Sequence, residues 1–265
     1  MKRNGFWGLA FNALFLVFMM APLVVVILVS FTAKGYLSMP FDGASLRWFR
    51  AILDDSDMLD AIWLSVRLAL VAATVGVALA VPAALALSRY RFPGRGALTG
   101  FFLSPMMIPA VVLGIAFLRF QSLLGLGGSF AALCAAHVVI VLPYALRLTL
   151  ASTAGLDRDA QRAALSCGAN RFTAFYRVVL PMIRTGVVGG WVLAFIQSFD
   201  ELTMTLFIAT PGSSTLPVAL YNAIAQTIDP LVASVSTVLI VCTVVLMLVL
   251  DRLVGLDRVL IGETR

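Results

Sequence analysis

The chain has little charge, one histidine and three cysteines. Only 12% of its 265 residues are charged, whereas 61% are hydrophobic, and the mean hydropathy is +1.02. A water-soluble domain carries about twice that share of charged residues, because water must solvate its surface. The composition therefore argues against a soluble catalytic lobe and predicts a protein embedded in a lipid bilayer.

Patterns for metals, nucleotides and nucleic acids are also lacking. Cys134, Cys167 and Cys242 are odd in number, far apart and placed in or near apolar segments, so we expect neither a disulfide framework nor a metal site. There is no Gly-x-x-x-x-Gly-Lys-Ser/Thr phosphate loop, so any ATP hydrolysis must come from another chain. The net charge of +6 lies mainly beside apolar runs, which predicts contacts with lipid headgroups rather than nucleic acid.

Six apolar runs are long enough to cross a bilayer, which needs about 20 helical residues. Backbone groups in hydrocarbon must bond within their own segment, so each run predicts a helix. The first run lacks a small-residue cleavage site, and we expect it to be retained. We therefore expect one all-α transmembrane domain over 1–265, with spans at about 8–31, 61–87, 98–120, 130–150, 186–209 and 231–250.

Basic and acidic loops alternate along the chain. The segments that begin at Lys2, Arg89 and Arg158 are rich in basic residues, as is the end of the chain, whereas 32–60 is acidic. Cytoplasmic loops retain an excess of Lys and Arg. Both termini are therefore expected in the cytoplasm.

Several prolines fall inside the expected spans. Each removes an N–H donor and clashes with the preceding turn, so each is expected to kink its helix unless neighbours compensate. Two interpretations stay open: the kinks shape a bundle around a pathway, or they reflect the ordinary tolerance of proline in membrane helices. The prolines inside the expected spans are Pro82, Pro105, Pro109 and Pro143.

The cytoplasmic loop at 151–184 is organised more than a simple connector needs to be. Asp157 is suited to cap a short helix and Gly168 to end it. An apolar stripe from Phe172 to Leu180 follows, and Pro181 is expected to break the chain before the fifth span. The short helix either docks on a partner or rests at the membrane surface. Its small side chains share one face at helical spacing: Ala160, Ala163, Ala164 and Cys167.

The stretch 162–168, Arg-Ala-Ala-Leu-Ser-Cys-Gly, is followed after nine residues by Val-Val-Leu-Pro at 178–181. This pattern resembles the EAA loop of binding-protein-dependent ABC-importer permeases. In that family the loop forms a coupling helix in a cleft of the cytoplasmic ATPase, which implies this role for about 157–170. Arg162 stands where the family usually has Glu. The coupling residues that the resemblance implies are Asp157, Asp159, Arg162, Ala163, Ala164, Gly168, Ala169 and Pro181.

The resemblance covers nearly the whole chain. The motifs at 86–92 and 142–145 also look like this family, and 198–201 with 215–217 is similar to its spermidine/putrescine subclass. It implies a six-helix type I permease fold in the bacterial inner membrane. The implied partners are a second homologous permease, two ATPase subunits that bind ATP and Mg²⁺, and a periplasmic solute-binding protein. Permeases for aminoethylphosphonate or ferric iron share much of this scaffold and stay open as alternatives.

Two adjacent carboxylates, Asp200 and Glu201, fall near the middle of the expected fifth span. Ionised groups are costly there unless they face water or a partner, and they would offset the desolvation of polyamine ammonium groups. Neighbours on a helix point about 100° apart, so the two cannot face one point equally. Both Asp200 and Glu201 are candidates to line the pathway, with Asp200 preferred, and a structural salt bridge or hydrogen bond stays open as the alternative. Aromatic residues at four-residue spacing suit cation–π contacts, although packing explains them as well: Trp191, Phe195 and Phe199.

Two other classes of protein fit the pattern less well. An intramembrane serine protease needs a serine and a histidine that face each other, yet Ser129 and His137 lie eight residues apart on one span. We expect His137 to be buried and hydrogen-bonded instead. A self-sufficient secondary transporter often carries internal repeats, which are not evident here, and it would leave the coupling loop without a purpose.

Overall fold

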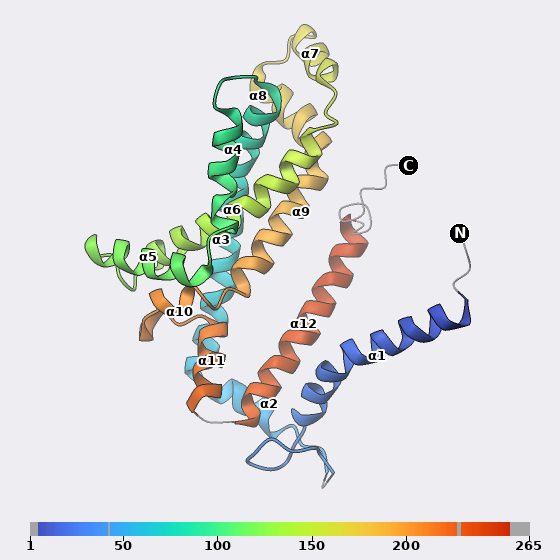
Figure 1. The fold of residues 1–265 in the computed structure, drawn as a ribbon, viewed down its shortest axis with the longest axis vertical. Coiled ribbons are helices and arrows are strands. Elements are labelled where there is room, and N and C mark those ends of the chain that lie inside the picture. Colours follow the sequence, from blue (N-terminus) through green and yellow to red (C-terminus); the bar gives the residue numbers. More distant parts are fainter. Residues whose placement is uncertain (1–4, 42, 227–228, 255–265) are drawn as a thin grey trace. The chain divides into compact units, whose positions relative to one another are not determined.

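The computed structural model describes residues 5–41, 43–226 and 229–254 (Figure 1). Regular structure in these ranges is helical, apart from an isolated bridge between Thr32 and Ala44. The chain divides into two compact units, one of residues 1–60 with 219–249 and the other of 61–218 with 250–265. The assignment of the whole chain to a single domain stays a prediction.

The first unit contains two long apolar helices and a short amphipathic one. Helix α1 (Phe6–Val29) has no buried residue, and α12 (Pro230–Val254) is similarly apolar. The Ser234 hydroxyl near the start of α12 donates to the Ser30 carbonyl at the end of α1, at 3.1 Å. Helix α2 (Arg47–Asp54) buries Trp48 and Ile52. The two long helices match the expected first and sixth spans.

The second unit is built around three helices: α3 (Ser56–Arg89), of which residues from 61 belong here, α6 (Phe130–Thr153) and α9 (Leu180–Phe199). Their core is apolar and tightly packed. Helices α3 and α6 continue through their prolines, Pro82 and Pro143. Side chains with less than 2% exposure include Leu68, Val141, Leu146 and Ile183.

Helices α6 and α9 approach closely because glycines line their contact. A Cβ atom added at Gly190 would lie 3.1 Å from the carbonyl oxygen of Ala145, and one at Gly186 would lie 2.6 Å from that of Leu148. The two glycines are four residues apart, so they lie on one face of α9. Small residues at this spacing let membrane helices pack backbone to backbone, so α6 and α9 form a rigid pair.

The expected third span at 98–120 is sharply bent, which confirms the expected kink at Pro105 and Pro109. Two helices, α4 (Arg95–Leu103) and α5 (Ala110–Leu123), are joined by a 3-10 turn and bend by 95° (Figure 1). Pro105 lies in the turn and Pro109 directly precedes α5. Neither has an N–H to continue the helix, and each disfavours helical backbone in the preceding residue. Within the described residues, five helices are long and apolar enough to cross a membrane, and the bent pair makes six spans if it counts as one.

Within the predicted loop at 151–184, α6 runs to Thr153 and the next long helical stretch begins at Arg171. Between them lies α7 (Arg158–Ser166). The expected break at Pro181 is wrong. Helix α8 (Arg171–Ala174) passes through a π-helical turn (Phe175–Val179) directly into α9. The proline follows the wider turn, where a missing N–H is more readily tolerated.

The predicted fifth span at 186–209 is wrong at its end, because it extends ten residues beyond the last residue of α9, Phe199. Helix α9 stops at Phe199, and the chain turns through 200–204 before α10 (Thr205–Ile208). A 3-10 turn (Pro211–Ser213) and α11 (Leu216–Gln226) follow. The N–H of Leu216 donates to the Ser65 hydroxyl of α3 at 2.7 Å. This contact anchors the returning chain against the core.

Candidate coupling helix and solute pathway

Helix α7 has the two ends that the sequence predicts. The Asp157 carboxylate accepts from the N–H of Asp159 at 2.8 Å, which satisfies one free donor of the first turn. At the other end, Gly168 has φ of +90°. Its N–H donates to the Leu165 carbonyl at 3.0 Å, and that of Ala169 donates to the Ala164 carbonyl at 3.1 Å. These two bonds form a Schellman motif, which makes α7 a short helix with defined ends.

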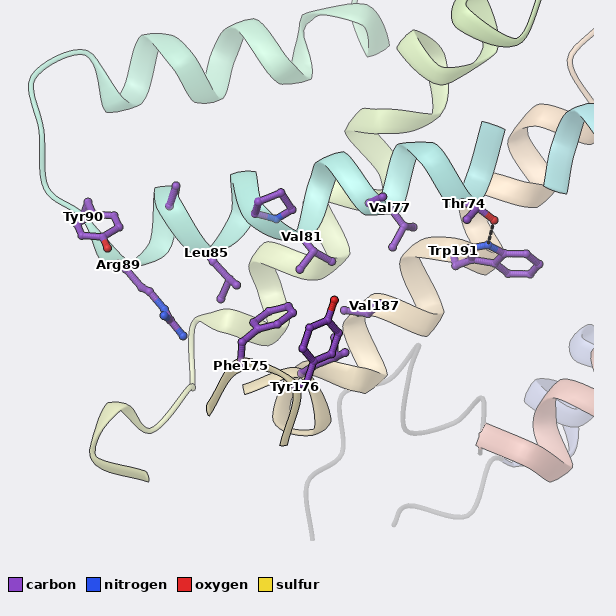
Figure 2. A pocket seen from close by; sticks show the side chains of 14 residues that line it. Thr74, Val77, Val81, Leu85, Arg89, Tyr90, Phe175, Tyr176, Val187 and Trp191 are labelled. Carbon is purple, nitrogen blue, oxygen red and sulfur yellow. Dashed lines mark hydrogen bonds between the residues drawn. The ribbon is translucent and has the colours of Figure 1, made fainter. Parts of the chain in front are cut away.

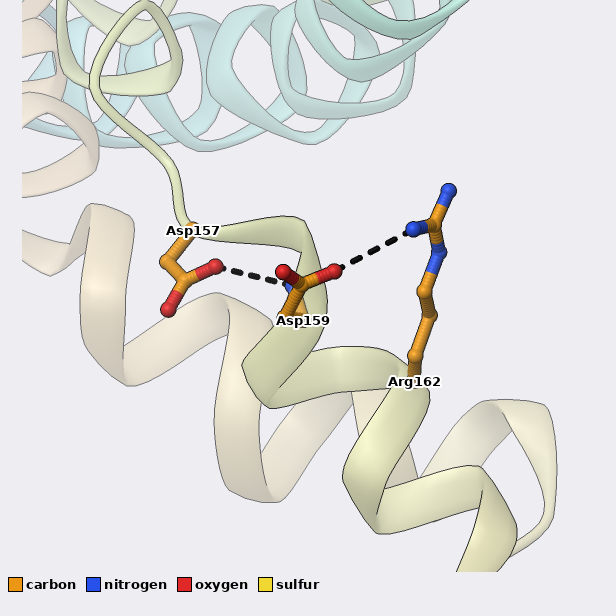
Figure 3. Close-up of polar contacts among 3 residues, drawn as sticks. All are labelled: Asp157, Asp159 and Arg162. Carbon is orange, nitrogen blue, oxygen red and sulfur yellow. Dashed lines mark hydrogen bonds and ion pairs between the residues drawn. The ribbon is translucent and has the colours of Figure 1, made fainter.

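An ion pair between Arg162 and Asp159 lies on the exposed surface of α7 (Figure 3). Arg162 Nη1 lies 3.1 Å from Asp159 Oδ1, and the two side chains are 74% and 83% exposed. An exposed pair of this spacing contributes only about 0.3–0.5 kcal/mol to helix stability. The arginine that departs from the family pattern is therefore held by a weak contact that a partner can replace.

The small face of α7 is available for close packing. Ala163 is exposed, and Ala160 and Ala164 are partly exposed. The helix contacts α8 and the π-helical turn, and it follows α6 after only four residues. A force on α7 would therefore reach both α6 and α9. The described ends and exposed face agree with the coupling role, and the contribution of each residue stays a prediction.

The two carboxylates do not lie in the middle of a helix, as predicted, but at its end. Asp200 caps the last turn of α9 and is exposed. Glu201 is 8% exposed, and its Oε1 accepts from the N–H of Met204 at 2.6 Å. A side chain that takes a backbone donor in this way competes with helical bonding. Glu201 therefore shapes the turn, and a place in the solute pathway stays a prediction for both carboxylates.

The aromatic residues at four-residue spacing form a ladder along α9. The rings of Trp191 and Phe195 lie 5.6 Å apart with an interplanar angle of 15°, and those of Phe195 and Phe199 lie 5.9 Å apart at 18°. The indole N–H of Trp191 also donates to the Thr74 hydroxyl of α3 at 3.1 Å (Figure 2). Stacking and this hydrogen bond account for the ladder as packing, and a cation–π role stays a prediction.

A cavity of about 700 Å³ lies between α3 and the segment that contains the π-helical turn and the start of α9 (Figure 2). Its walls are mainly apolar, with Arg89 and Tyr90 where α3 ends and Trp191 on α9. The sequence alone gave no signal for it, because it combines 74–90 with 175–191. The prolines contribute here, since Pro82 lines the cavity.

His137 is buried and hydrogen-bonded, which confirms its prediction. It is 1% exposed, and its ring nitrogens bond the hydroxyls of Ser198 and Thr205. The Ser129 hydroxyl instead accepts from the N–H of Ala132 at 3.2 Å as the cap of α6. The serine and the histidine are thus engaged separately, against the protease alternative. Among the residues that the structure describes, no three His, Cys, Asp or Glu side chains form a metal cluster.

Known proteins resemble this chain over most of its length. The spermidine/putrescine transport system permease protein PotC of Escherichia coli K12 is 28% identical over 256 residues, covering 97% of this chain and 94% of that protein. The putrescine transport system permease protein PotI of the same strain is 28% identical over 248 residues, covering 88% of this chain and 85% of that protein. The putative 2-aminoethylphosphonate transport system permease protein PhnV of Salmonella paratyphi A is 28% identical, covering 93% of each.

A solved structure supports the fold. A bacterial ABC transporter involved in the import of the acidic polysaccharide alginate contains a chain that matches with a TM-score of 0.78 at 15% identity. The match covers 96% of this chain and 98% of that one, which establishes the type I permease fold. The sequence profile of the binding-protein-dependent transport system inner membrane component matches residues 73–256. Because that region is well over half of the chain, the protein belongs to this family of inner membrane transport components.

Proposed function

We propose that this chain is one of two permease subunits of an ATP-driven importer that moves a polyamine from the periplasm to the cytoplasm by alternating access. The observation that carries the proposal is α7, a capped nine-residue helix whose small face is open to a partner. A permease without a motor of its own needs such an element. Two ATPase subunits would bind ATP and Mg²⁺, and each would hold one coupling helix.

Movement would pass from α7 into the membrane through α6 and α9. Helix α7 is joined to α6 by a short connection and packs against the π-helical turn that leads into α9. The glycine contact makes those two helices move together. From Arg184 to Asp200 the helix rises by about 24 Å, most of the hydrocarbon thickness. A cytoplasmic movement would thus displace the turn that carries Asp200.

The proposed substrate rests on the relatives and on charge. PotC and PotI are polyamine permeases by name and match this chain nearly end to end. The exposed carboxylate of Asp200 at the end of α9 would attract an ammonium group of the solute. A second homologous permease would complete the pathway, and a periplasmic binding protein would deliver the solute. Both termini would then lie in the cytoplasm.

Uptake by the complex reconstituted in liposomes tests the substrate proposal. The Asp200→Asn variant should raise the KM for spermidine or putrescine about tenfold, which corresponds to 1.4 kcal/mol, because the solute loses one charge contact. The matched control is Asp54→Asn, which removes another exposed carboxylate at the end of a helix, α2. Equal KM values for wild type and both variants would refute the role of Asp200.

An aminoethylphosphonate importer is the second candidate, because PhnV matches 93% of the chain. Its name implies a solute with both an ammonium and a phosphonate group. Such a solute needs a cationic partner as well as Asp200. Competition experiments separate the two: uptake of labelled aminoethylphosphonate that excess spermidine does not inhibit would favour this second candidate.

A further inference from the structure

A buried polar contact joins α6 to both sides of the break after α9. His137 Nδ1 lies 2.9 Å from the Ser198 hydroxyl, and Nε2 lies 3.0 Å from the Thr205 hydroxyl. The three residues are 1%, 3% and 0% exposed, respectively. A neutral imidazole offers one donor and one acceptor, and hydroxyls can take either role. Both ring nitrogens are therefore satisfied without a charge in the protein interior.

The two hydroxyls flank the turn that carries the carboxylates. Ser198 belongs to the last turn of α9, and Thr205 is the first residue of α10. Within the turn, backbone bonds are local: Asp200 N–H donates to Ile196 and Met204 N–H to Glu201. Local bonds stabilise the turn itself, but they do not connect it to a neighbouring helix. The imidazole of His137 connects the turn to α6, because His137 belongs to that helix.

Close packing of α5 against the turn leaves little room for movement. A Cβ atom added at Gly114 of α5 would lie 3.1 Å from the Met204 carbonyl oxygen and 3.2 Å from its Cα. Met204 itself is 0% exposed. Helix α5 thus packs closely against the turn at Met204, and the imidazole of His137 hydrogen-bonds the residues on both sides of the turn. A tightly packed turn of this kind adopts a few discrete conformations rather than a continuous range of conformations.

We propose that His137 is a positioning residue, a clamp that fixes the angle between α9 and α10 and so holds Asp200 in place for the solute. The inference rests on the proposed transport function. It also joins the site to the coupling region, because His137 lies on α6, about 24 Å along the helix from its last residue, Thr153.

The substitutions differ in what they leave behind. His137→Phe keeps the ring volume and removes both polar partners, so Ser198 and Thr205 are free to bond carbonyls of their own helices. His137→Gln keeps one donor group and one acceptor on a flexible side chain. The matched control is Gln121→Met, which removes a different buried contact, the bond from Gln121 Nε2 to the Ala132 carbonyl at 3.1 Å.

The first measurement needs no solute. Spin labels at positions 196 and 206, both exposed in α9 and α10, report the distance across the turn in the complete complex after the native cysteines are replaced. The clamp predicts a broader distance distribution in His137→Phe than in wild type, partial narrowing in His137→Gln, and no change in Gln121→Met. An unchanged distribution in His137→Phe overturns the proposal, whatever the solute is.

The second measurement is uptake by the same complexes. A clamp predicts a KM raised about tenfold in His137→Phe, with the maximal rate and the basal ATPase activity within about twofold of wild type. A role in folding alone predicts the reverse: fewer active complexes, a lower maximal rate and an unchanged KM, which would overturn the clamp. If the wild-type complex imports no polyamine, the substrate proposal fails, and the label distances still decide on the clamp.

Discussion

Replacing Gly186 by alanine should force α6 and α9 apart and weaken coupling between ATP hydrolysis and uptake. The new Cβ would lie 2.6 Å from the Leu148 carbonyl oxygen, whereas ordinary contact begins at 3.4 Å. The backbones must therefore separate by about 0.8 Å. Overpacking of this kind costs about 1–3 kcal/mol, against a gain of up to about 1 kcal/mol in helix propensity over glycine.

Two further variants calibrate the effect. At Gly190 the nearest carbonyl oxygen, that of Ala145, is 3.1 Å from the new Cβ, so Gly190→Ala requires a shift of only about 0.3 Å. At Gly100, in the exposed interior of α4, nothing lies within 4 Å. The free energy of unfolding should therefore fall most for Gly186→Ala, less for Gly190→Ala and not at all for Gly100→Ala.

The assay is unfolding of the purified permease in mixed detergent micelles, followed by the ratio of ATP hydrolysed to solute imported in liposomes. Gly186→Ala should raise that ratio, because a loosened helix pair transmits less of the movement of α7. If Gly186→Ala matches Gly100→Ala in both stability and coupling, the close contact of α6 with α9 does not act as a rigid connection.

Three other changes test the site. Gly168→Val places a branched side chain at φ of +90°, at a cost of about 1–2 kcal/mol; the complex should assemble, but its ATP hydrolysis should become independent of solute. Glu201→Leu leaves the Met204 N–H buried without its partner and should lower the free energy of unfolding by about 1–3 kcal/mol, whereas Glu201→Gln should retain most of it. Arg162→Glu should change helix stability by less than about 0.5 kcal/mol, while ATPase binding in a pull-down assay changes measurably.

Local signals in the sequence predicted α7 well. Asp157 and Gly168 act on backbone groups within a few residues, so their roles as first cap and last turn can be inferred without tertiary contacts. Long apolar runs were equally reliable, because bilayer thickness fixes the length of a helix. Helix α7 and four of the five long helices were therefore predicted close to their observed positions, whereas α9 ends at Phe199, ten residues before the expected end of the fifth span.

The bends and the solute end of α9 depend on long-range contacts. His137 bonds residues that follow it by 61 and 68 positions, and Gly114 of α5 packs on Met204. Hydropathy showed the run at 186–209 as continuous, since it does not register a carboxylate that bonds a backbone N–H. In the same way, Pro105 and Pro109 indicated a kink in the third span but not its angle.

The π-helical turn at Phe175–Val179 sets the rotational phase between the two ends of one long helix, Arg171–Phe199. Such a turn holds one residue more than an α-helical turn of the same rise. Deleting one residue there would turn α7 by about 100° around the axis of α9 relative to Asp200. Variants that shorten or lengthen this turn would thus point the surface of α7 that is proposed to bind the ATPase in a different direction. No residue of that surface would need to change.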